Sequence, residues 1–265
     1  MEWVAELGSA TGRSVAYVGG LAEILGKSLW LLFLSPLKRA RMLQRAVHEA
    51  MAVGVGAIPI VSLITFFVGV IIALQGAYEL QRLGAMQIVA SLVAISITRE
   101  LGPLITAIVV IGRSGSAFAA EIGTMRVTEE LDALQTMALD PVAFLVVPKF
   151  LAMAVMMPCL AIWADLMGIF GGSLFGVIGG GFTFSGYWIA TRDALLLRDL
   201  TSGFIKSLVF GLVITAVGCQ EGFATGAGAE AVGRSTTSAV VISILMVILI
   251  DLAFTTLFYL AKGGA

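Results

Sequence analysis

The chain has 265 residues, of which 59% are hydrophobic and only 12% are charged, and its formal net charge is -1. This composition excludes an ordinary soluble fold and is typical of an all-α integral membrane protein with several spans. No basic block is long enough to follow a phosphate backbone, which excludes nucleic acid as a partner. One histidine and two isolated cysteines exclude an imidazole or thiolate metal site.

Residues 1–50 are expected to form an amino-terminal region at the membrane surface, because the short apolar run that ends at Leu34 lacks a signal-cleavage site. Leucine and isoleucine recur here at helical spacing, with Trp30 as an interfacial anchor. A basic cluster follows Pro36 and is typical of a cytoplasmic segment. The glycines around Lys27 lack the spacing of a phosphate-binding loop, so we expect neither nucleotide binding nor another cofactor.

Residues 51–265 are expected to form one transmembrane domain. Five runs are apolar and long enough to cross a bilayer, and they cover 51–78, 86–112, 144–178, 201–223 and 236–260. A short interfacial helix is expected in the segment 182–199. Lysine and arginine concentrate on the side of the amino terminus, which predicts a cytoplasmic amino terminus and, after five spans, an external carboxyl terminus.

The third span carries glycine at every fourth position. This spacing produces a smooth helix face that lets two membrane helices approach closely, and it comprises Gly168, Gly172, Gly176 and Gly180. We therefore interpret these glycines as helix-packing residues.

The linker 113–140 is expected to lie in the cytoplasm and to contain an amphipathic helix. Its apolar residues alternate with acidic residues in helical rhythm, and the apolar set comprises Ile122, Met125, Leu131, Leu134 and Met137. An acidic cytoplasmic surface is unusual for a membrane protein and favours a docked protein. An ordinary solvated loop helix explains the composition equally well.

Four ionisable residues of the expected spans are candidates for a functional site, because an unpaired charge inside a bilayer costs about 3 kcal/mol or more. They are Arg99, Glu100, Lys206 and Asp251. Two acids and two bases can form a polar network that only stabilises the fold, or they can line a cavity that accepts a charged headgroup or an ion. Nothing resembles a hydrolytic centre, so the chain is not expected to be an enzyme.

Three segments carry a resemblance to a known family. They are RELGPLITAIVVIGRSGSAFAAEIGTMRVTEELDALQTMALDP, GLVITAVGCQEGFATGAGAEAVGRSTTSAVV and ILIDLAFTTLFYL. With these motifs, the chain from about Lys27 onward closely resembles the MlaE (YrbE) permeases of the Mce/Mla lipid ABC transporters.

The resemblance implies a homodimer in the bacterial inner membrane. Each subunit would have an amino-terminal elbow helix, five spans, a cytoplasmic coupling helix between the second and third spans, and a short periplasmic helix between the third and fourth. The implied partners are a cytoplasmic ABC ATPase, a periplasmic Mce-domain subunit and a small STAS-domain protein. The implied function is ATP-driven transport of phospholipid between the inner membrane and the periplasm or outer membrane, which maintains outer-membrane lipid asymmetry.

The resemblance also implies site residues. Arg99 and Glu100 match the RELGP motif, Lys206 matches the IKS lysine, Asp251 matches the aspartate of the last span, and Gln75 matches the LQG glutamine. These five are expected to line or support the lipid cavity, with the two acids holding the two cations in place. The segment AAEIG departs from the general coupling motif of ABC permeases, and the expected ATPase contacts are Glu121, Ile122, Met125, Arg126, Glu129 and Leu131.

Two other function classes compete with this interpretation. A self-contained ion-coupled carrier would use the intramembrane acids as ion sites, but such carriers usually contain an internal repeat, and five unequal spans show none. An integral-membrane lipid enzyme would need a nucleophile and base, which the sequence does not offer. A neighbouring gene for an ATPase would favour the transporter over both.

Overall fold

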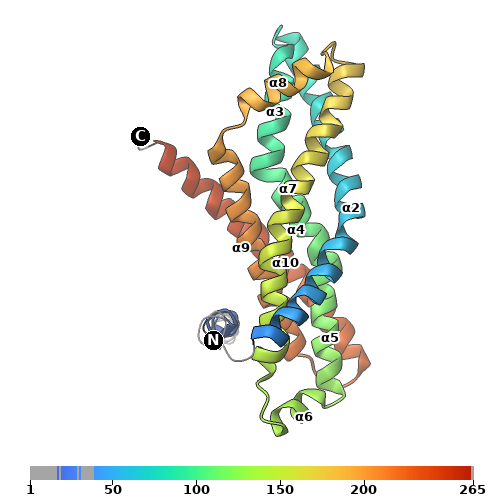
Figure 1. Cartoon of the computed structure of the whole chain (residues 1–265), viewed down its shortest axis with the longest axis vertical. Coiled ribbons are helices and arrows are strands. Elements are labelled where there is room, and N and C mark those ends of the chain that lie inside the picture. The colour runs from blue at the N-terminus through green and yellow to red at the C-terminus, as the bar shows by residue number, and fades with distance from the viewer. Residues whose placement is uncertain (1–16, 18, 29, 31–38, 264–265) are drawn as a thin grey trace, which may run out of the picture.

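A computed structural model describes residues 17, 19–28, 30 and 39–263. The described part is helical, and no strand occurs in it. Five segments are long and apolar enough to cross a membrane: Met42–Arg82, Met86–Val127, Val142–Ile178, Leu197–Phe223 and Ala229–Leu260. The predicted all-α membrane fold with five spans is therefore confirmed (Figure 1).

The first span belongs to α2 (Arg39–Arg82), which contains 44 residues. At 1.5 Å per residue it is about 66 Å long, roughly twice the thickness of the hydrocarbon core. Its first turns, which contain arginine residues, therefore extend beyond the hydrocarbon core. The expected boundary between residues 50 and 51 falls inside this continuous helix.

The second span is a chain of short helices that includes two π-helical turns. It contains η2 (Met86–Ile88), α3 (Val89–Ser96), the π-turn η3 (Ile97–Leu101), α4 (Gly102–Val110), the π-turn η4 (Ile111–Gly115) and α5 (Ser116–Val127). Arg99 and Glu100 lie in η3 and Arg113 lies in η4. π-turns occur frequently at functional sites because they widen the helix and redirect its side chains.

The chain reverses after α5 through a left-handed residue, Glu129 (φ 61°), and forms the short helix α6 (Glu130–Thr136). The third span then contains a π-turn, η5 (Val142–Val146), followed by α7 (Val147–Ile178). Figure 1 shows α6 at the end of the bundle opposite α8 (Phe184–Ala194), so these two short helices mark its two ends.

The fourth and fifth spans are α9 (Leu197–Phe223) and α10 (Ala229–Gly263). The last turns of α10 extend beyond the other helices (Figure 1). Arg198 and Asp199, expected in the interfacial segment, belong to the first turn of α9.

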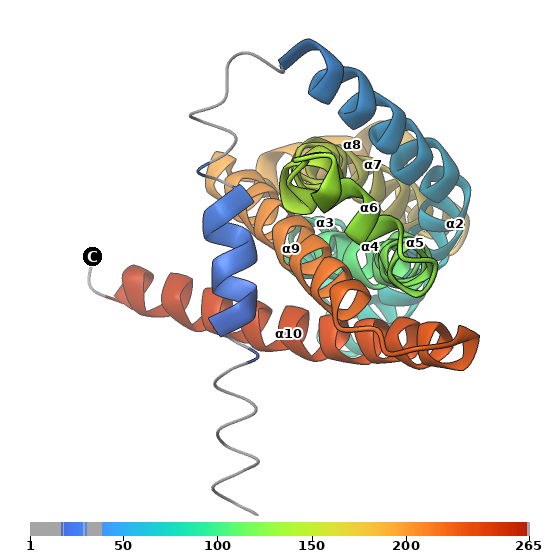
Figure 2. The same ribbon diagram turned by 90° about the horizontal axis from the view of Figure 1, so that it is seen from below.

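The amino-terminal region is described only in part. Residues 19–28 form a helix that lies across α9 and α10 in the view from below (Figure 2). Gln220 Nε2 donates a hydrogen bond of 3.0 Å to the carbonyl of Tyr17, and Leu21 is buried against the same end of the bundle. Burial and the nearby Glu221 raise the pKa of the Tyr17 hydroxyl, which therefore stays neutral. The preceding and following parts of the expected elbow lie outside the described residues.

The helices pack around an apolar core in which α2, α4, α7 and α9 meet. Val61, Val110, Met157 and Ile214 are fully buried there. A second cluster lies at the α6 end and a third beneath α8. Because α7 contributes to the core along much of its length, it is the central helix of the bundle.

Candidate functional site

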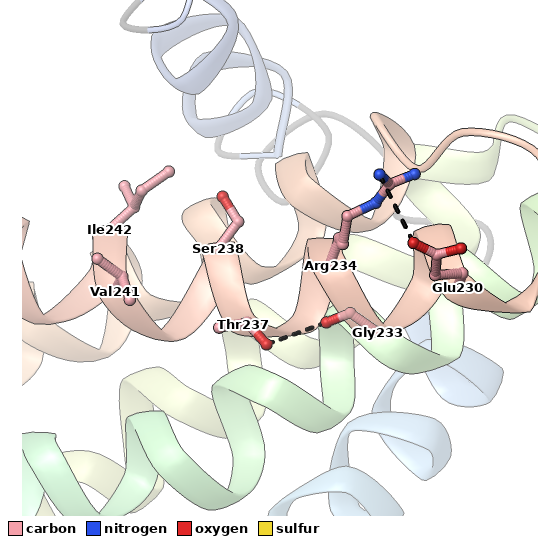
Figure 3. Close-up of a pocket in the computed structure, with 7 residues that line it drawn as sticks. All are labelled: Glu230, Gly233, Arg234, Thr237, Ser238, Val241 and Ile242. Atoms are coloured by element: carbon pink, nitrogen blue, oxygen red, sulfur yellow. Dashed lines mark hydrogen bonds and ion pairs between the residues drawn. The ribbon is translucent and has the colours of Figure 1, made fainter.

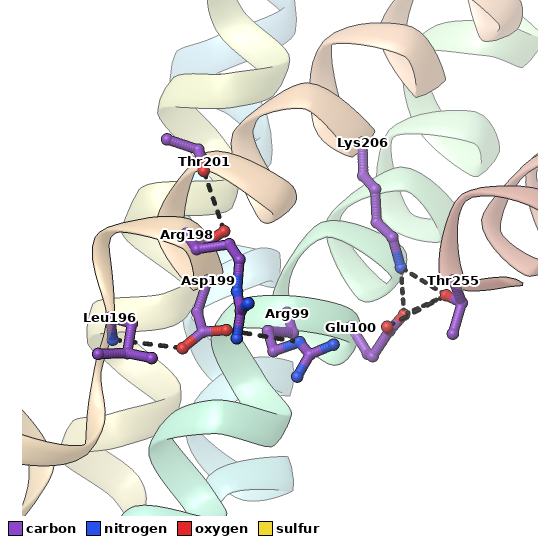
Figure 4. A network of polar contacts seen from close by, with 8 residues as sticks. All are labelled: Arg99, Glu100, Leu196, Arg198, Asp199, Thr201, Lys206 and Thr255. Carbon is purple, nitrogen blue, oxygen red and sulfur yellow. Dashed lines mark hydrogen bonds and ion pairs between the residues drawn. The ribbon is translucent and has the colours of Figure 1, made fainter. Parts of the chain in front are cut away.

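A lysine is buried at the centre of a polar cluster between three helices. Lys206 on α9 has no exposed surface, and its ammonium contacts a carboxylate oxygen of Glu100. It also lies 2.8 Å from Asp251 Oδ1 and donates a hydrogen bond of 2.9 Å to Thr255 Oγ1. Figure 4 shows Lys206, Glu100 and Thr255 pointing toward one another. We call these four residues the Lys206 cluster.

The local structure explains why these side chains meet. Glu100 projects from the π-turn η3, and Asp251 and Thr255 are four residues apart on one face of α10. The Thr255 hydroxyl lies 3.1 Å from Glu100 Oε1, so it links the acid and the lysine. The Glu100 side chain remains 34% exposed and that of Asp251 17% exposed. The cluster therefore has a buried cation and two carboxylates that remain accessible from one side.

Arg99 has a different partner from the one expected. Its Nε lies 3.6 Å from Asp199 Oδ1, and Asp199 Oδ2 accepts a hydrogen bond of 3.2 Å from the Leu196 amide (Figure 4). The expectation that Glu100 and Asp251 hold both cations is thus right for Lys206 and wrong for Arg99. Asp199 escaped the sequence analysis because it lies in a polar segment, although an acid in the first turn of a helix is a common capping signal.

Gln75, the fifth residue expected at this site, is exposed on α2. Its helix packs against α3, α4 and α7, whereas the Lys206 cluster belongs to η3, α9 and α10. Within one chain, Gln75 therefore stands apart from the cluster.

A further acid lies near this region. Asp165 on α7 has a buried oxygen, Oδ1, for which the described residues provide no hydrogen-bond donor. A Cβ atom placed on Gly102 would lie 1.9 Å from this oxygen, so glycine is required next to the carboxyl group. Asp165 carries the same sequence signal as Asp251, a single acid within a long apolar run, but it was not among the residues expected at the site.

The residues expected to contact an ATPase divide into two groups. Ile122 is fully buried and Leu131 is 6% exposed, and both pack in the core of the chain itself. Glu121, Arg126 and Glu129 are exposed, and Met125 is half-buried. The acidic surface of this linker was expected to favour a docked protein; of its apolar stripe, Ile122, Leu131 and Leu134 cover the core of this chain. Arg126 also donates a hydrogen bond to the carbonyl of Phe223, which caps the end of α9.

A second buried lysine lies at the α6 end of the bundle. Lys149 on α7 is 1% exposed, and its Nζ lies 2.7 Å from Glu49 Oε1 and 2.7 Å from Glu121 Oε2. These three residues, here called the Lys149 triad, join α2, α5 and α7. The triad could not be predicted from the sequence, because its members are far apart in the chain.

The four glycines of the third span have different environments. A Cβ atom on Gly69 of α2 would lie 1.9 Å from the carbonyl oxygen of Gly168, so α2 and α7 approach backbone to backbone at this point. A Cβ atom on Gly172 or Gly176 would collide with Tyr187. Burial raises the pKa of this tyrosine to about 12, so its hydroxyl stays neutral. Gly180 lies beyond the end of α7.

An open hollow occurs on the outer face of α10. It has a volume of about 680 Å³ and a mixed lining that includes Gly233, Thr237 and Val241. Figure 3 shows these residues on α10, with Glu230 and Arg234 toward one end. The two charged groups are 3.8 Å apart and highly exposed, so this ion pair contributes little to stability.

Metal chemistry finds no support in the described residues, where no group of three histidine, cysteine or acidic side chains could hold an ion. Cys159 and Cys219 are free, and Cys219 is buried. The Lys206 cluster offers a cation and two partly exposed carboxylates, which can bind a ligand through charge and hydrogen bonds.

Comparison with known proteins gives consistent matches over most of the chain. Residues 46–257 match the family described as Permease MlaE. A probable ABC transporter permease protein of Rickettsia prowazekii is 40% identical over 225 residues, which cover 85% of this chain and 87% of the relative. The intermembrane phospholipid transport system permease protein MlaE of Haemophilus influenzae is 33% identical over 255 residues, covering 95% and 97%. The chloroplastic protein TRIGALACTOSYLDIACYLGLYCEROL 1 of Arabidopsis thaliana is 34% identical over 257 residues, covering 96% and 70%.

Proposed function

The chain belongs to the MlaE permease family and is a permease of an ABC transporter, and we propose that its cargo is phospholipid. In this proposal the transporter moves phospholipid between the inner membrane and the periplasm or outer membrane and maintains outer-membrane lipid asymmetry. The name of the Haemophilus influenzae relative, a phospholipid transport permease, supports this cargo.

The observation that carries the proposal is the Lys206 cluster. A fully buried ammonium with two partly exposed carboxylates lies between spans, where unpaired charges are costly. The accessible groups of this cluster are carboxylates, which would complement the cationic part of a lipid headgroup. Arg99, whose side chain is 36% exposed beside Asp199, would supply the cation for the phosphate. Gln75 contributes to the cavity only if a second subunit brings it close.

ATP hydrolysis belongs to a separate ATPase subunit, as the permease family implies. We propose that the ATPase contacts the turn between α5 and α6, where Glu129 is exposed, whereas Glu121 lies further back on α5 in the Lys149 triad. Ile122 and Leu131 would hold this turn against the bundle, and Arg126 would fix it to the end of α9. A movement of this turn would then be transmitted to the core of the bundle through these contacts.

The proposed assembly is a homodimer with a periplasmic Mce-domain subunit and a small STAS-domain protein. For α10, only 11% of its most apolar window is buried within the chain, compared with 28% to 67% for the other spans. This exposed face supports a second copy as its neighbour. The proposed orientation has a cytoplasmic amino terminus and a periplasmic carboxyl terminus, because α6 and the amino-terminal helix lie at the basic end.

The test is purification of the chain from its native membrane in mild detergent, followed by mass spectrometry of proteins and lipids. We expect an ATPase, an Mce-domain protein and phospholipid to copurify with it. Recovery of a dimer without any ATPase would contradict the proposal and favour the self-contained ion-coupled carrier.

A further inference from the structure

A second open hollow lies at the α6 end of the bundle, between α2, α5 and α7. Its volume is about 990 Å³. The Lys149 triad belongs to its lining, together with Arg45 and His48 of α2 and Phe144 at the start of the third span. This hollow shares no residue with the Lys206 cluster.

The Lys149 triad gives the hollow a fixed polar wall. The buried ammonium uses Glu49 Oε1 and Glu121 Oε2 and lies 4.8 Å from the Phe118 ring centroid. The other oxygens, Glu49 Oε2 and Glu121 Oε1, accept no hydrogen bond from the described residues. The two side chains are 24% and 48% exposed. One ammonium therefore pairs with two carboxylates. The two free carboxylate oxygens can accept hydrogen bonds from a second cation.

The rim of the hollow carries a positive charge. The guanidinium of Arg45 lies 3.6 Å from the Phe144 ring centroid, which holds it in place. It forms no ion pair with a carboxylate of the described residues. A guanidinium of this kind is a strong partner for a phosphate group.

The mouth of the hollow opens onto an apolar stripe. Leu43, Val47 and Met51 line it at intervals of four residues and are 61%, 50% and 55% exposed. Val55, 66% exposed, continues the stripe along α2 into the first span. The first turns of α2 lie at the height of the amino-terminal helix in Figure 1, which places the hollow near the membrane surface.

We propose that this hollow binds a phospholipid with a primary-ammonium headgroup, of the phosphatidylethanolamine type. The phosphate contacts Arg45 and His48, the ammonium donates hydrogen bonds to Glu49 and Glu121, and an acyl chain follows the stripe on α2. This site is separate from the Lys206 cluster, where we propose that the cargo binds. The inference rests on the proposed function only in assuming that the chain is surrounded by phospholipid.

The headgroup chemistry provides the sharpest test. A quaternary ammonium has the same charge as a primary ammonium but no N–H donor, so it cannot satisfy the two carboxylate oxygens. We would place the purified chain in nanodiscs with a trace of photoactivatable phosphatidylethanolamine or its phosphatidylcholine analogue, and map the crosslinked residues by mass spectrometry. We expect crosslinks concentrated at Leu43, Val47 and Met51, with about tenfold more from the ethanolamine lipid.

Variants separate this site from the general lipid shell. Arg45→Gln should reduce crosslinking at the stripe about tenfold, and Glu121→Gln should reduce the preference for the primary ammonium. The matched control is Arg82→Gln, because Arg82 is at the other end of α2 and also lies over an aromatic ring, that of Tyr78, at 4.7 Å. We expect this control to leave the crosslinks unchanged.

Equal crosslinking by the two lipids, or an even spread over the exposed face of α2, would overturn the proposal. If Arg45→Gln does not fold, the comparison of the two lipids on the unaltered chain still tests the proposal. The measurement needs neither an ATPase nor transport. A failure here would therefore leave the proposed transport function standing, and a failure to copurify with an ATPase would leave this site standing.

Discussion

Lys206 shows how a full charge can be stable inside a membrane bundle. Its ammonium loses its hydration completely and obtains Glu100, Asp251 and Thr255 in return. Removing one member of such a group leaves the other charges buried without a partner, which typically costs about 3–5 kcal/mol. The cluster is therefore sensitive to single changes even if it adds little to the net stability.

We predict that Lys206→Met lowers the free energy of unfolding by about 3–5 kcal/mol, measured by titration with a denaturing detergent in mixed micelles. Lys206→Met combined with Glu100→Gln should be less destabilised than the single variant, because one of the two unpaired carboxylates becomes neutral. The control is Lys27→Met, since Lys27 pairs with Asp140 at 2.9 Å on the surface, with exposures of 43% and 37%. It should change stability by about 1 kcal/mol or less. Equal losses in Lys206→Met and Lys27→Met would contradict this account.

Individual residues show what the sequence can and cannot predict about the site. Glu100, Lys206 and Asp251 could be identified because each interrupts an apolar run, and the structure brings them together. The partner of Arg99 could not be identified, because Asp199 lies in a polar segment where a charge is ordinary. The Lys149 triad escaped for a different reason: its members are 28 and 100 residues apart, and only the packing of three helices unites them.

At the scale of elements, the contact between α2 and α7 depends on the absence of side chains. A Cβ atom on Gly69 would meet the backbone carbonyl of Gly168, and one on Gly171 would meet that of Phe66 at 2.1 Å. Backbone atoms cannot move aside as flexible side chains do. The helices must therefore separate if either glycine acquires a side chain.

We predict that Gly69→Ala destabilises the protein by about 1–3 kcal/mol, the usual cost of overpacking, in the same denaturation measurement. The control is Gly112→Ala, because a Cβ at that position meets nothing within 4 Å. Alanine is a better helix former than glycine by up to about 1 kcal/mol, so the control should be neutral or slightly stabilising. Destabilisation of both variants by the same amount would show that the close approach is not the cause.

The short helix α6 permits a separate test of ATPase docking. Leu131 and Leu134 form the buried face of this helix, whereas Asp132 lies on its exposed face. We predict that Asp132→Lys reduces copurification of the ATPase several-fold and lowers stability by only about 1 kcal/mol or less, because the exposed side chain loses little more than a favourable place in the first turn of α6. Asp193→Lys is the control, since Asp193 is an exposed acid on α8 at the opposite end. A similar loss in both variants, or in neither, would contradict docking at α6.

At the scale of the whole molecule, composition and the spacing of apolar runs were sufficient to predict five spans. Their lengths were underestimated: α2 begins at Arg39 and the second span continues to Val127. Hydropathy detects only the part of a helix that lipid surrounds, whereas capping and packing decide where the helix ends. The buried side of the segment 121–137 was equally hidden, because an apolar stripe has the same pattern whether it covers a partner or its own core.

The exposed face of α10 gives the last prediction. Val241 is 52% exposed and lies on the hollow drawn in Figure 3, and a dimer built on α10 would bring two copies of this position close together. In a Cys159→Ser background, Val241→Cys should therefore crosslink two subunits with a short thiol-reactive reagent, observed as a dimer on a denaturing gel. Ile71→Cys is the control, because Ile71 is 50% exposed on α2 and would face lipid. Buried Cys219 is common to both variants. Crosslinking through Ile71→Cys but not through Val241→Cys would place the interface on α2, and it would also bring Gln75 of that helix toward the second subunit.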